Sequence, residues 1–175
     1  VSLGLVGMLS VSIVARLGGT DGFARRAAAA GLDGLIVPDC PVEEAEELAG
    51  SAREAGLTLS LLVAPTTTEQ RMRAIAEESS GFVYLLARAG VTGAQEAAPE
   101  IERPVSQLRA ITDLPIACGV GIAKAERVRA GVAHADAAIV GSALARAIDA
   151  AQDAGEDPIA AAGALTRQLA TGLPA

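Results

Sequence analysis

Aromatic side chains are almost absent from this sequence of 175 residues, which has one tyrosine, two phenylalanines and no tryptophan. Hydrophobic residues still make up 51% of it, so a core has to be built from alanine, valine, leucine and isoleucine. This content excludes a disordered chain. Cysteine is also scarce. Two thiols, Cys40 and Cys118, are too few for a disulfide scaffold and predict a reducing compartment, the cytoplasm.

Positive charge is in short supply as well, since 14 Lys and Arg face 21 Asp and Glu, for a net charge of −7. This balance argues against a general nucleic-acid binder and against adsorption to an anionic membrane. The apolar stretch 1–15 resembles the middle of a signal peptide, but no basic segment precedes it and it is too short to span a bilayer. We therefore expect a buried strand there and no membrane attachment. No metal-ligand spacing is found in the sequence.

Apolar runs that do not alternate with polar residues predict parallel strands buried on both faces. Amphipathic stretches lie between them and predict helices, two of which end at Gly31 and Gly56. The expected strands are part of 3–14, 34–37, 57–63, 82–86, 114–117 and 137–140. The expected helices are 21–30, 43–55, 68–79, 101–111, 124–130, 143–151 and 157–170. This α/β alternation favours one domain over residues 1–175, with a parallel sheet that is either doubly wound or a (β/α)8 barrel of the TIM type.

Two glycine clusters follow the last two expected strands directly. They are the segment 118–122, with Gly119 and Gly121, and the pair Gly141-Ser142. Glycines let the backbone approach an anion, and the free N–H groups at a helix start supply donors and a favourable dipole. Barrels often bind phosphate after strands seven and eight, whereas no G-x-G-x-x-G follows the first strand as a dinucleotide site requires. The pair of clusters therefore predicts a phosphate site, although each cluster alone would be read as a tight turn.

Counting back from strand eight at 137–140 makes the first expected strand number three. A barrel of this type typically has about 250 residues, so 175 residues fall short by about two βα units. We therefore expect an incomplete barrel of about six units with an open parallel edge at each end, a chain of marginal stability or one that self-associates.

Three further features carry candidate functional residues. The chain's only tyrosine, Tyr84, begins a segment 84–93 that runs into a loop with two glycines and Thr92. Asp39 follows another strand between two prolines, where it either caps the helix expected near Glu43 or serves a function. His134, the only histidine, is expected at the surface or as a helix cap, and both cysteines as packing residues without a histidine partner.

Four segments resemble the tryptophan synthase alpha chain in order and spacing: 34–44, 84–93, 119–122 and 141–142, within a resemblance that covers about residues 21–150. The resemblance implies a (β/α)8 barrel that splits indole-3-glycerol phosphate into indole and glyceraldehyde 3-phosphate by a retro-aldol step. It also implies a lyase of tryptophan biosynthesis with no cofactor of its own. Its indole would pass to the tryptophan synthase beta chain, whose pyridoxal phosphate joins it to serine.

The resemblance also implies roles for particular residues. The phosphate would be bound by Gly93, Gly121, Gly141 and Ser142. Tyr84 and Thr92 would lie near the substrate, and Asp39 and Pro41 near the indole pocket and the beta-chain surface.

Two departures from the family pattern bear on activity. The family's catalytic glutamate, and the aspartate that holds the indole N–H, are expected ahead of Val1, so no catalytic residue is expected within this chain. Loss of general acid–base catalysis would lower the rate by about 10²–10⁴-fold. The segment 8–14 also differs from the aromatic-rich run, ending in Asn-Pro, that many members carry. Two alternatives remain open here: another phosphate-binding barrel, such as a sugar-phosphate isomerase or thiamine-phosphate synthase, and a non-catalytic relative that binds the beta chain.

Overall fold

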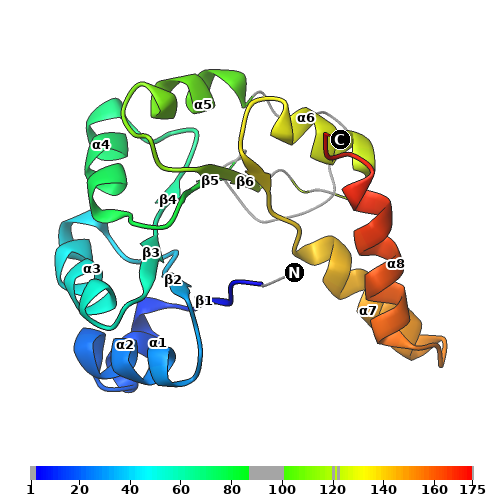
Figure 1. Ribbon diagram of the computed structural model, residues 1–175, viewed down its shortest axis with the longest axis horizontal. Helices are drawn as coiled ribbons and strands as arrows, with labels where there is room; N and C mark the ends of the chain where they lie inside the picture. The colour runs from blue at the N-terminus through cyan, green and yellow to red at the C-terminus, as the bar shows by residue number, and fades with distance from the viewer. Residues whose placement is uncertain (1–2, 87–100, 120, 122, 175) are drawn as a thin grey trace.

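Short parallel strands alternate with helices along an arc in the computed structural model, which describes residues 3–86, 101–119, 121 and 123–174 (Figure 1). The strands are Val6–Met8 (β1), Gly34–Ile36 (β2), Thr58–Ser60 (β3), Leu62–Val63 (β4), Val83–Leu86 (β5), Ile116–Gly119 (β6) and Ala137–Ala138 (β7). The helices are Val11–Arg16 (α1), Gly19–Ala29 (α2), Ala45–Glu54 (α3), Glu69–Glu78 (α4), Glu102–Arg109 (α5), Ala125–Val132 (α6), Ser142–Asp153 (α7) and Pro158–Ala170 (α8), with a 3-10 turn at Val42–Glu44 (η1).

The strands form two parallel sheets, in the orders β1-β2-β3 and β4-β5-β6-β7. They line the inner side of the arc, and helices cover its outer side (Figure 1). Side chains that face the helices are fully buried, for example Leu35, Leu59 and Leu85 at 0% exposure. Within the described residues β1 and β7 each have one neighbouring strand, so the barrel is not closed. The expected fold, an incomplete (β/α)8 barrel, is confirmed.

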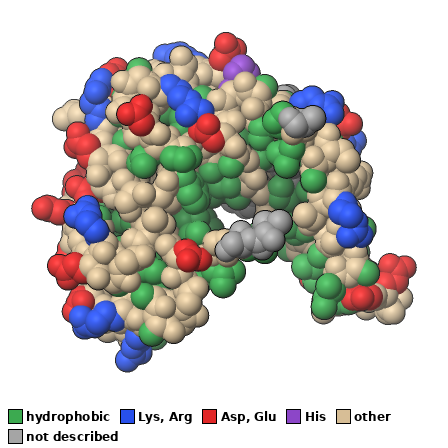
Figure 2. Space-filling model, in the orientation of Figure 1, with side chains coloured by type: hydrophobic (Ala, Val, Ile, Leu, Met, Phe, Trp, Pro, Cys, Tyr) green, Lys and Arg blue, Asp and Glu red, His purple; other side chains and the backbone are tan. Residues whose placement is uncertain are grey.

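The inner side of the arc is apolar and hollowed (Figure 2). By the alternation of the strands, Leu62, Tyr84 and Leu86 face it, and all three are half-buried, whereas their neighbours Val63 and Leu85 are fully buried beneath helices. In a closed barrel this inner face is filled by layers of side chains. None of the helices in the described part of the chain is long and apolar enough to cross a membrane.

The expected strand 57–63 is divided into β3 and β4, which belong to different sheets. Serine hydroxyl groups take the place of regular ladder bonds there. Ser80 Oγ accepts from the N–H of Leu59 at 3.0 Å, and Ser60 Oγ accepts from the N–H of Phe82 at 3.1 Å. Ser79 Oγ likewise accepts from the N–H of Leu61 at 3.3 Å. These side-chain bonds keep the backbone groups satisfied while the sheet changes direction.

The expectation of a strand within 3–14 is confirmed by β1 at Val6–Met8, but the expectation that this strand is buried is wrong. Val6 and Met8 are 41% and 54% exposed, because among the described strands β1 pairs only with β2. The chain then turns into helix α1, with Ser10 at its N-cap. The N–H of Val11 donates to Asp39 Oδ1 at 2.8 Å, so a carboxylate distant in sequence satisfies a free donor of this first turn.

Asp136 joins β6 to the helix before it. Its Oδ1 accepts from Arg109 at 2.7 Å and its Oδ2 accepts from the N–H of Ile116 at 2.8 Å, at the start of β6. The Arg109 guanidinium holds the pKa of the Asp136 carboxyl below its usual value, and the bond from Ile116 acts in the same direction. The ionised form of Asp136 therefore stabilises the junction of α5, β6 and β7.

We expect Asp136→Asn to lower the free energy of unfolding at pH 7 by about 1 kcal/mol. The expected loss of stability is small because the side chains of Arg109 and Asp136 remain 43% and 41% exposed, and water screens their attraction. A carboxyl with a depressed folded pKa stabilises above its unfolded pKa, about 3.9, and loses that contribution as the pH falls through the folded pKa. Urea unfolding at a series of pH values should therefore show the wild type and the variant converging below about pH 4. A constant difference down to pH 2, or an equal loss in the exposed control Asp153→Asn, would contradict this role.

Candidate functional site

The candidate site lies where β5, β6 and β7 end. These strands are adjacent and parallel, so their carboxyl ends meet at one edge of the sheet. The structure brings Tyr84, Gly121, Gly141 and Ser142 to strands or strand ends of this group. Thr92 and Gly93, the other two residues of the predicted phosphate and substrate set, lie outside the described residues.

The ring of Tyr84 packs against the backbone of Gly119 on the neighbouring strand. A Cβ at Gly119 would lie 2.7 Å from Tyr84 Oη and 3.0 Å from its Cε1, closer than real side chains approach. Glycine at this position therefore makes room for the ring. Burial raises the pKa of the Tyr84 hydroxyl, with a smaller contribution from the Cys118 thiol, so this hydroxyl stays protonated and able to donate at neutral pH.

The two predicted glycine loops have different backbone geometries. Gly121 has φ of +61°, in the left-handed region that glycine adopts without strain. Gly141 is the N-cap of α7, with φ of −121°, and Ser142 is the first residue of that helix. No side chain caps α7, and the same holds for α1, α2, α3, α5 and α6, whereas Thr68 and Asp157 cap α4 and α8. An anion at the N-terminus of α7 would supply the missing acceptor and interact favourably with the helix dipole.

Asp39 does not cap the helix after it. Both η1 and α3 begin without a side-chain cap, and the exposed Asp39 instead accepts from the N–H of Val11 at the start of α1. It thereby ties the loop after β2 to the loop after β1. Pro41, its neighbour, is the N-cap of η1.

A cavity of about 240 Å³ lies between the loop after β2, the strands β4 and β5, and helix α4. Pro41 lines it, as do Leu62 and Leu86 from the inner face of the arc. Glu43 and Arg71 form a two-bond ion pair beside it, at 2.5 and 3.2 Å, and the pair lowers the pKa of the Glu43 carboxyl. The sequence analysis missed Leu62, Leu86 and Arg71, although the alternation within each strand assigns the first two to the inner face.

Three further candidate residues are His134 and the two cysteines, of which Cys40 lines the cavity and Cys118 lies in β6. His134 is exposed in the turn after α6, at the surface as expected. Its backbone N–H donates to the carbonyl of Gly131 at 3.3 Å. Cys118 is fully buried and Cys40 half-buried, and burial raises the pKa of both thiols. Among the residues that the structure describes, no three His, Cys, Asp or Glu side chains gather in a way that could hold a metal ion.

The contact between Tyr84 and Gly119 predicts the effect of Gly119→Ala. We expect the new methyl group to displace the ring and to cost about 1–3 kcal/mol of stability, as overpacking does. Because the chain has one tyrosine and no tryptophan, near-ultraviolet circular dichroism at the tyrosine band should change with it. Gly50→Ala is the control. A Cβ there meets nothing within 4 Å, in the middle of α3, so that variant should be neutral or slightly more stable and keep the tyrosine signal. An unchanged tyrosine signal in Gly119→Ala would show that the ring is not held there.

Parallel strands with helices on the outer face, and glycine loops at the carboxyl ends of the last two strands, define a protein of the βα-barrel class. The sequence model of the tryptophan synthase alpha chain family matches residues 2–173. The tryptophan synthase alpha chain of Carboxydothermus hydrogenoformans is 44% identical over 149 residues, which are 85% of this chain and 55% of that relative. The alpha chain of Methanosarcina barkeri is 48% identical over 139 residues, 79% of this chain and 52% of the relative.

Solved structures give the same result. The structure of Mycobacterium tuberculosis tryptophan synthase matches with a TM-score of 0.83 and 38% identity, over 97% of this chain and 62% of that one. Tryptophan synthase subunit alpha from Legionella pneumophila matches with a TM-score of 0.84 and 32% identity, over the same shares of the two chains. The chain therefore belongs to the tryptophan synthase alpha chain family. It spans about half the length of the curated relatives that it matches.

Proposed function

We propose that this chain serves as the alpha chain of tryptophan synthase, a lyase of tryptophan biosynthesis in the cytoplasm. Its substrate is indole-3-glycerol phosphate, which a retro-aldol step splits into indole and glyceraldehyde 3-phosphate. The observation that carries the proposal is the position of two glycine loops, Gly121 and the α7 N-cap Gly141, directly after the adjacent parallel strands β6 and β7. The family match over residues 2–173 favours this substrate over those of other phosphate-binding barrels.

The phosphate group binds at the strand ends, on backbone N–H groups that glycine leaves accessible. A Cβ at Gly141 would meet nothing within 4 Å, so the backbone is open to an anion at this point. Ser142 adds a hydroxyl at the first residue of the helix. Gly121 and Gly93 complete the phosphate set, as the resemblance to the family implies.

Tyr84 and the cavity of about 240 Å³ serve the rest of the substrate. Tyr84 projects from the inner face of β5 with a protonated hydroxyl, and the resemblance to the family implies that Thr92 also lies near the substrate. Asp39 and Pro41 shape the loop after β2, near the indole side of the site, and this loop is also part of the surface for the beta chain. The bond from Val11 to Asp39 fixes that loop at its start.

The reaction needs an acid and a base, at the indole ring carbon and at the hydroxyl group, and no cofactor of the alpha chain. Residues 1–175 supply the binding half of this site. The resemblance assigns these roles to a glutamate and an aspartate of the family, and we identify no counterpart of either in residues 1–175. Pyridoxal phosphate belongs to the partner beta chain, which consumes the indole.

Substitution of Gly141 tests the phosphate site directly. We expect Gly141→Asp to weaken the binding of glycerol 3-phosphate by about tenfold or more, because a carboxylate repels the phosphate at the helix N-terminus. Gly141→Asn is the matched control. Both side chains cap a helix well and have open space, but asparagine brings no charge and should weaken binding less. Isothermal titration calorimetry gives both affinities.

Equal loss of affinity in the two variants would assign the effect to bulk and not to phosphate charge. Undiminished binding in Gly141→Asp would place the phosphate elsewhere and overturn the proposed site. A chain that binds glycerol 3-phosphate and the beta chain, yet releases no indole from indole-3-glycerol phosphate, would identify it as a non-catalytic member of the family.

A further inference from the structure

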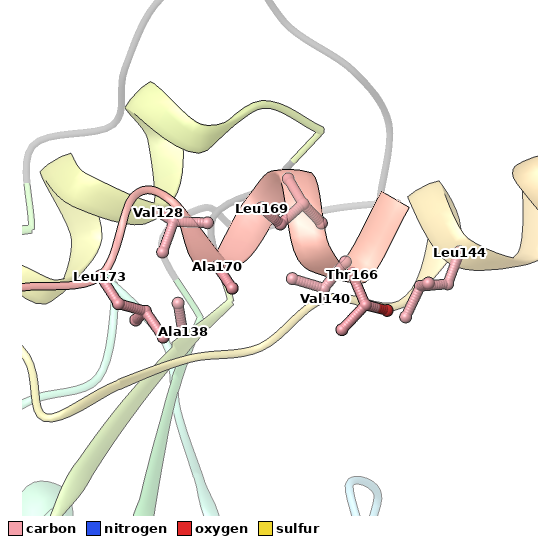
Figure 3. Close-up of a pocket in the computed structure, with 8 residues that line it drawn as sticks. All are labelled: Val128, Ala138, Val140, Leu144, Thr166, Leu169, Ala170 and Leu173. Atoms are coloured by element: carbon pink, nitrogen blue, oxygen red, sulfur yellow. The ribbon is translucent and has the colours of Figure 1, made fainter. Parts of the chain in front are cut away.

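Two cavities of this structure differ in the chemistry of their walls. One, of about 190 Å³, lies between α6, β7, α7 and α8 (Figure 3), and the described residues that line it, such as Val128, Leu144 and Leu173, carry no charge. The other is the cavity of about 240 Å³ described above, and Arg71 is among the residues that line it. The walls of this second cavity can therefore be joined by an ion pair.

Two of the walls of the 240 Å³ cavity belong to different βα units. Residues 38–44 after β2, called the β2 loop below, contribute Pro41 and Val42, whereas α4 and the turn before it contribute Thr67, Arg71 and Ile75. The turn η1 at the end of the β2 loop also packs against α4. The position of the β2 loop relative to α4 therefore sets the width of the cavity.

The α4 wall is firmly fixed. Thr68 caps the helix by accepting from the N–H of Arg71 at 3.4 Å, and Met72 and Ile75 are buried at 2% and 7% exposure. Because Arg71 lies in this capped first turn, its backbone has a defined position. Movement between the two walls therefore falls to the β2 loop.

The β2 loop has little buried surface of its own. It runs between the buried residues Val37 and Ala45, but none of the three residues of η1 is buried. Side-chain bonds hold it instead. Asp39 fixes its start, as described above, and near its end Glu43 accepts from both terminal nitrogens of Arg71, at 2.5 and 3.2 Å. This ion pair joins the two walls of the cavity.

The pair is built for a reversible contact. Its two parallel bonds have the bidentate geometry in which an exposed ion pair does contribute to stability. The Arg71 and Glu43 side chains nevertheless remain 50% and 62% exposed, so water screens their attraction and the contact opens at small cost. A second ion pair of α4, Arg73–Glu69 at 2.9 Å, joins residues four apart within the helix and holds no other element.

We infer that the Glu43–Arg71 ion pair is a latch that holds the β2 loop against α4 and so sets the width of the cavity for the apolar ring of the ligand. Glu43 and Arg71 are positioning residues that act through Pro41 and Val42. The latch stands on the geometry alone, whereas its role toward an indole ring rests on the proposed function.

Cys40 reports on the latch without any ligand. Its thiol is half-buried in the β2 loop, lines the cavity and donates to the carbonyl of Pro41 at 3.6 Å. Opening of the loop exposes this thiol to a reagent. Cys118, the other cysteine, is fully buried in β6 and reacts only when the fold opens more widely. Comparison of the two thiols therefore separates loop opening from unfolding.

The test is a double-mutant cycle read by alkylation with N-ethylmaleimide, followed by mass spectrometry of the two cysteine peptides. Arg71→Glu and Glu43→Arg each place like charges opposite one another, and the double variant restores the pair in reverse. Direct effects of the new charges on the Cys40 thiolate add up and cancel in the cycle. We expect the product of the two single-variant accelerations at Cys40 to exceed the double-variant acceleration about fivefold or more.

Arg73→Glu is the control on the same helix. It breaks the pair with Glu69 but does not line the cavity, so Cys40 should be alkylated at close to the wild-type rate. Single-variant effects that simply multiply in the double variant would show that the pair does not hold the loop. An equal acceleration at Cys118 would assign the effect to loss of the fold. Either result would overturn the latch.

Two ligands that share a phosphate test the role toward the ring. In calorimetry, each single variant should weaken indole-3-propanol phosphate about threefold or more relative to glycerol 3-phosphate, and the double variant should restore the ratio. Equal weakening of the two ligands would overturn the positioning role. A wild-type chain that binds neither ligand would contradict the proposed function, and the role toward the ring with it, while the alkylation cycle still decides the latch.

Discussion

A parallel strand is stable when both of its faces are covered and both of its edges are paired, and all the strands paired in this structure are parallel. The helices meet this requirement on the outer side of the arc, where Leu35, Leu59 and Leu85 are fully buried. They do not meet it on the inner side or at β1 and β7. The exposed Val6 and Met8 and the apolar hollow in Figure 2 both follow from that one constraint.

The same parallel arrangement places the candidate site. Adjacent parallel strands end at one edge, so the ends of β5, β6 and β7 bring distant parts of the chain together. Small residues at these ends leave the backbone accessible at Gly141 and make room for the Tyr84 ring at Gly119. Side-chain bonds between neighbouring βα units, such as those of Asp39 with Val11 and Glu43 with Arg71, then hold the carboxyl edge together.

Local signals were sufficient to predict most of the elements. The helix expected at 68–79 is observed at Glu69–Glu78, because Thr68 caps it through the N–H of Arg71, and Gly31 and Gly56 adopt the positive φ that ends a helix. The bounds of these helices could be predicted because a cap and a terminal glycine each act on residues only a few positions away in the sequence. The glycine clusters were expected after the last two strands, and in the structure they follow the adjacent strands β6 and β7.

Features that depend on distant partners were not predicted. Helix α1 is stabilised by Asp39, which lies 28 residues beyond Val11, and the division of 57–63 depends on serine hydroxyls about 20 residues further along the chain. The cavity lined by Leu62 and Leu86 requires the register of β4 and β5, which no local pattern contains. Side-chain bonds across loops and the packing of separate strands decide such features.

The most direct measurement of the central claim is a titration of the ¹⁵N-labelled chain with glycerol 3-phosphate, followed by amide chemical shifts. The account predicts that the amide signals of Gly121, Gly141 and Ser142 move together with one saturation curve, while those of Gly31 and Gly56 at the ends of α2 and α3 stay in place. Shifts that cluster at Gly31 and Gly56, or the absence of a saturable shift in the residues after β6 and β7, would contradict a phosphate site at these strand ends.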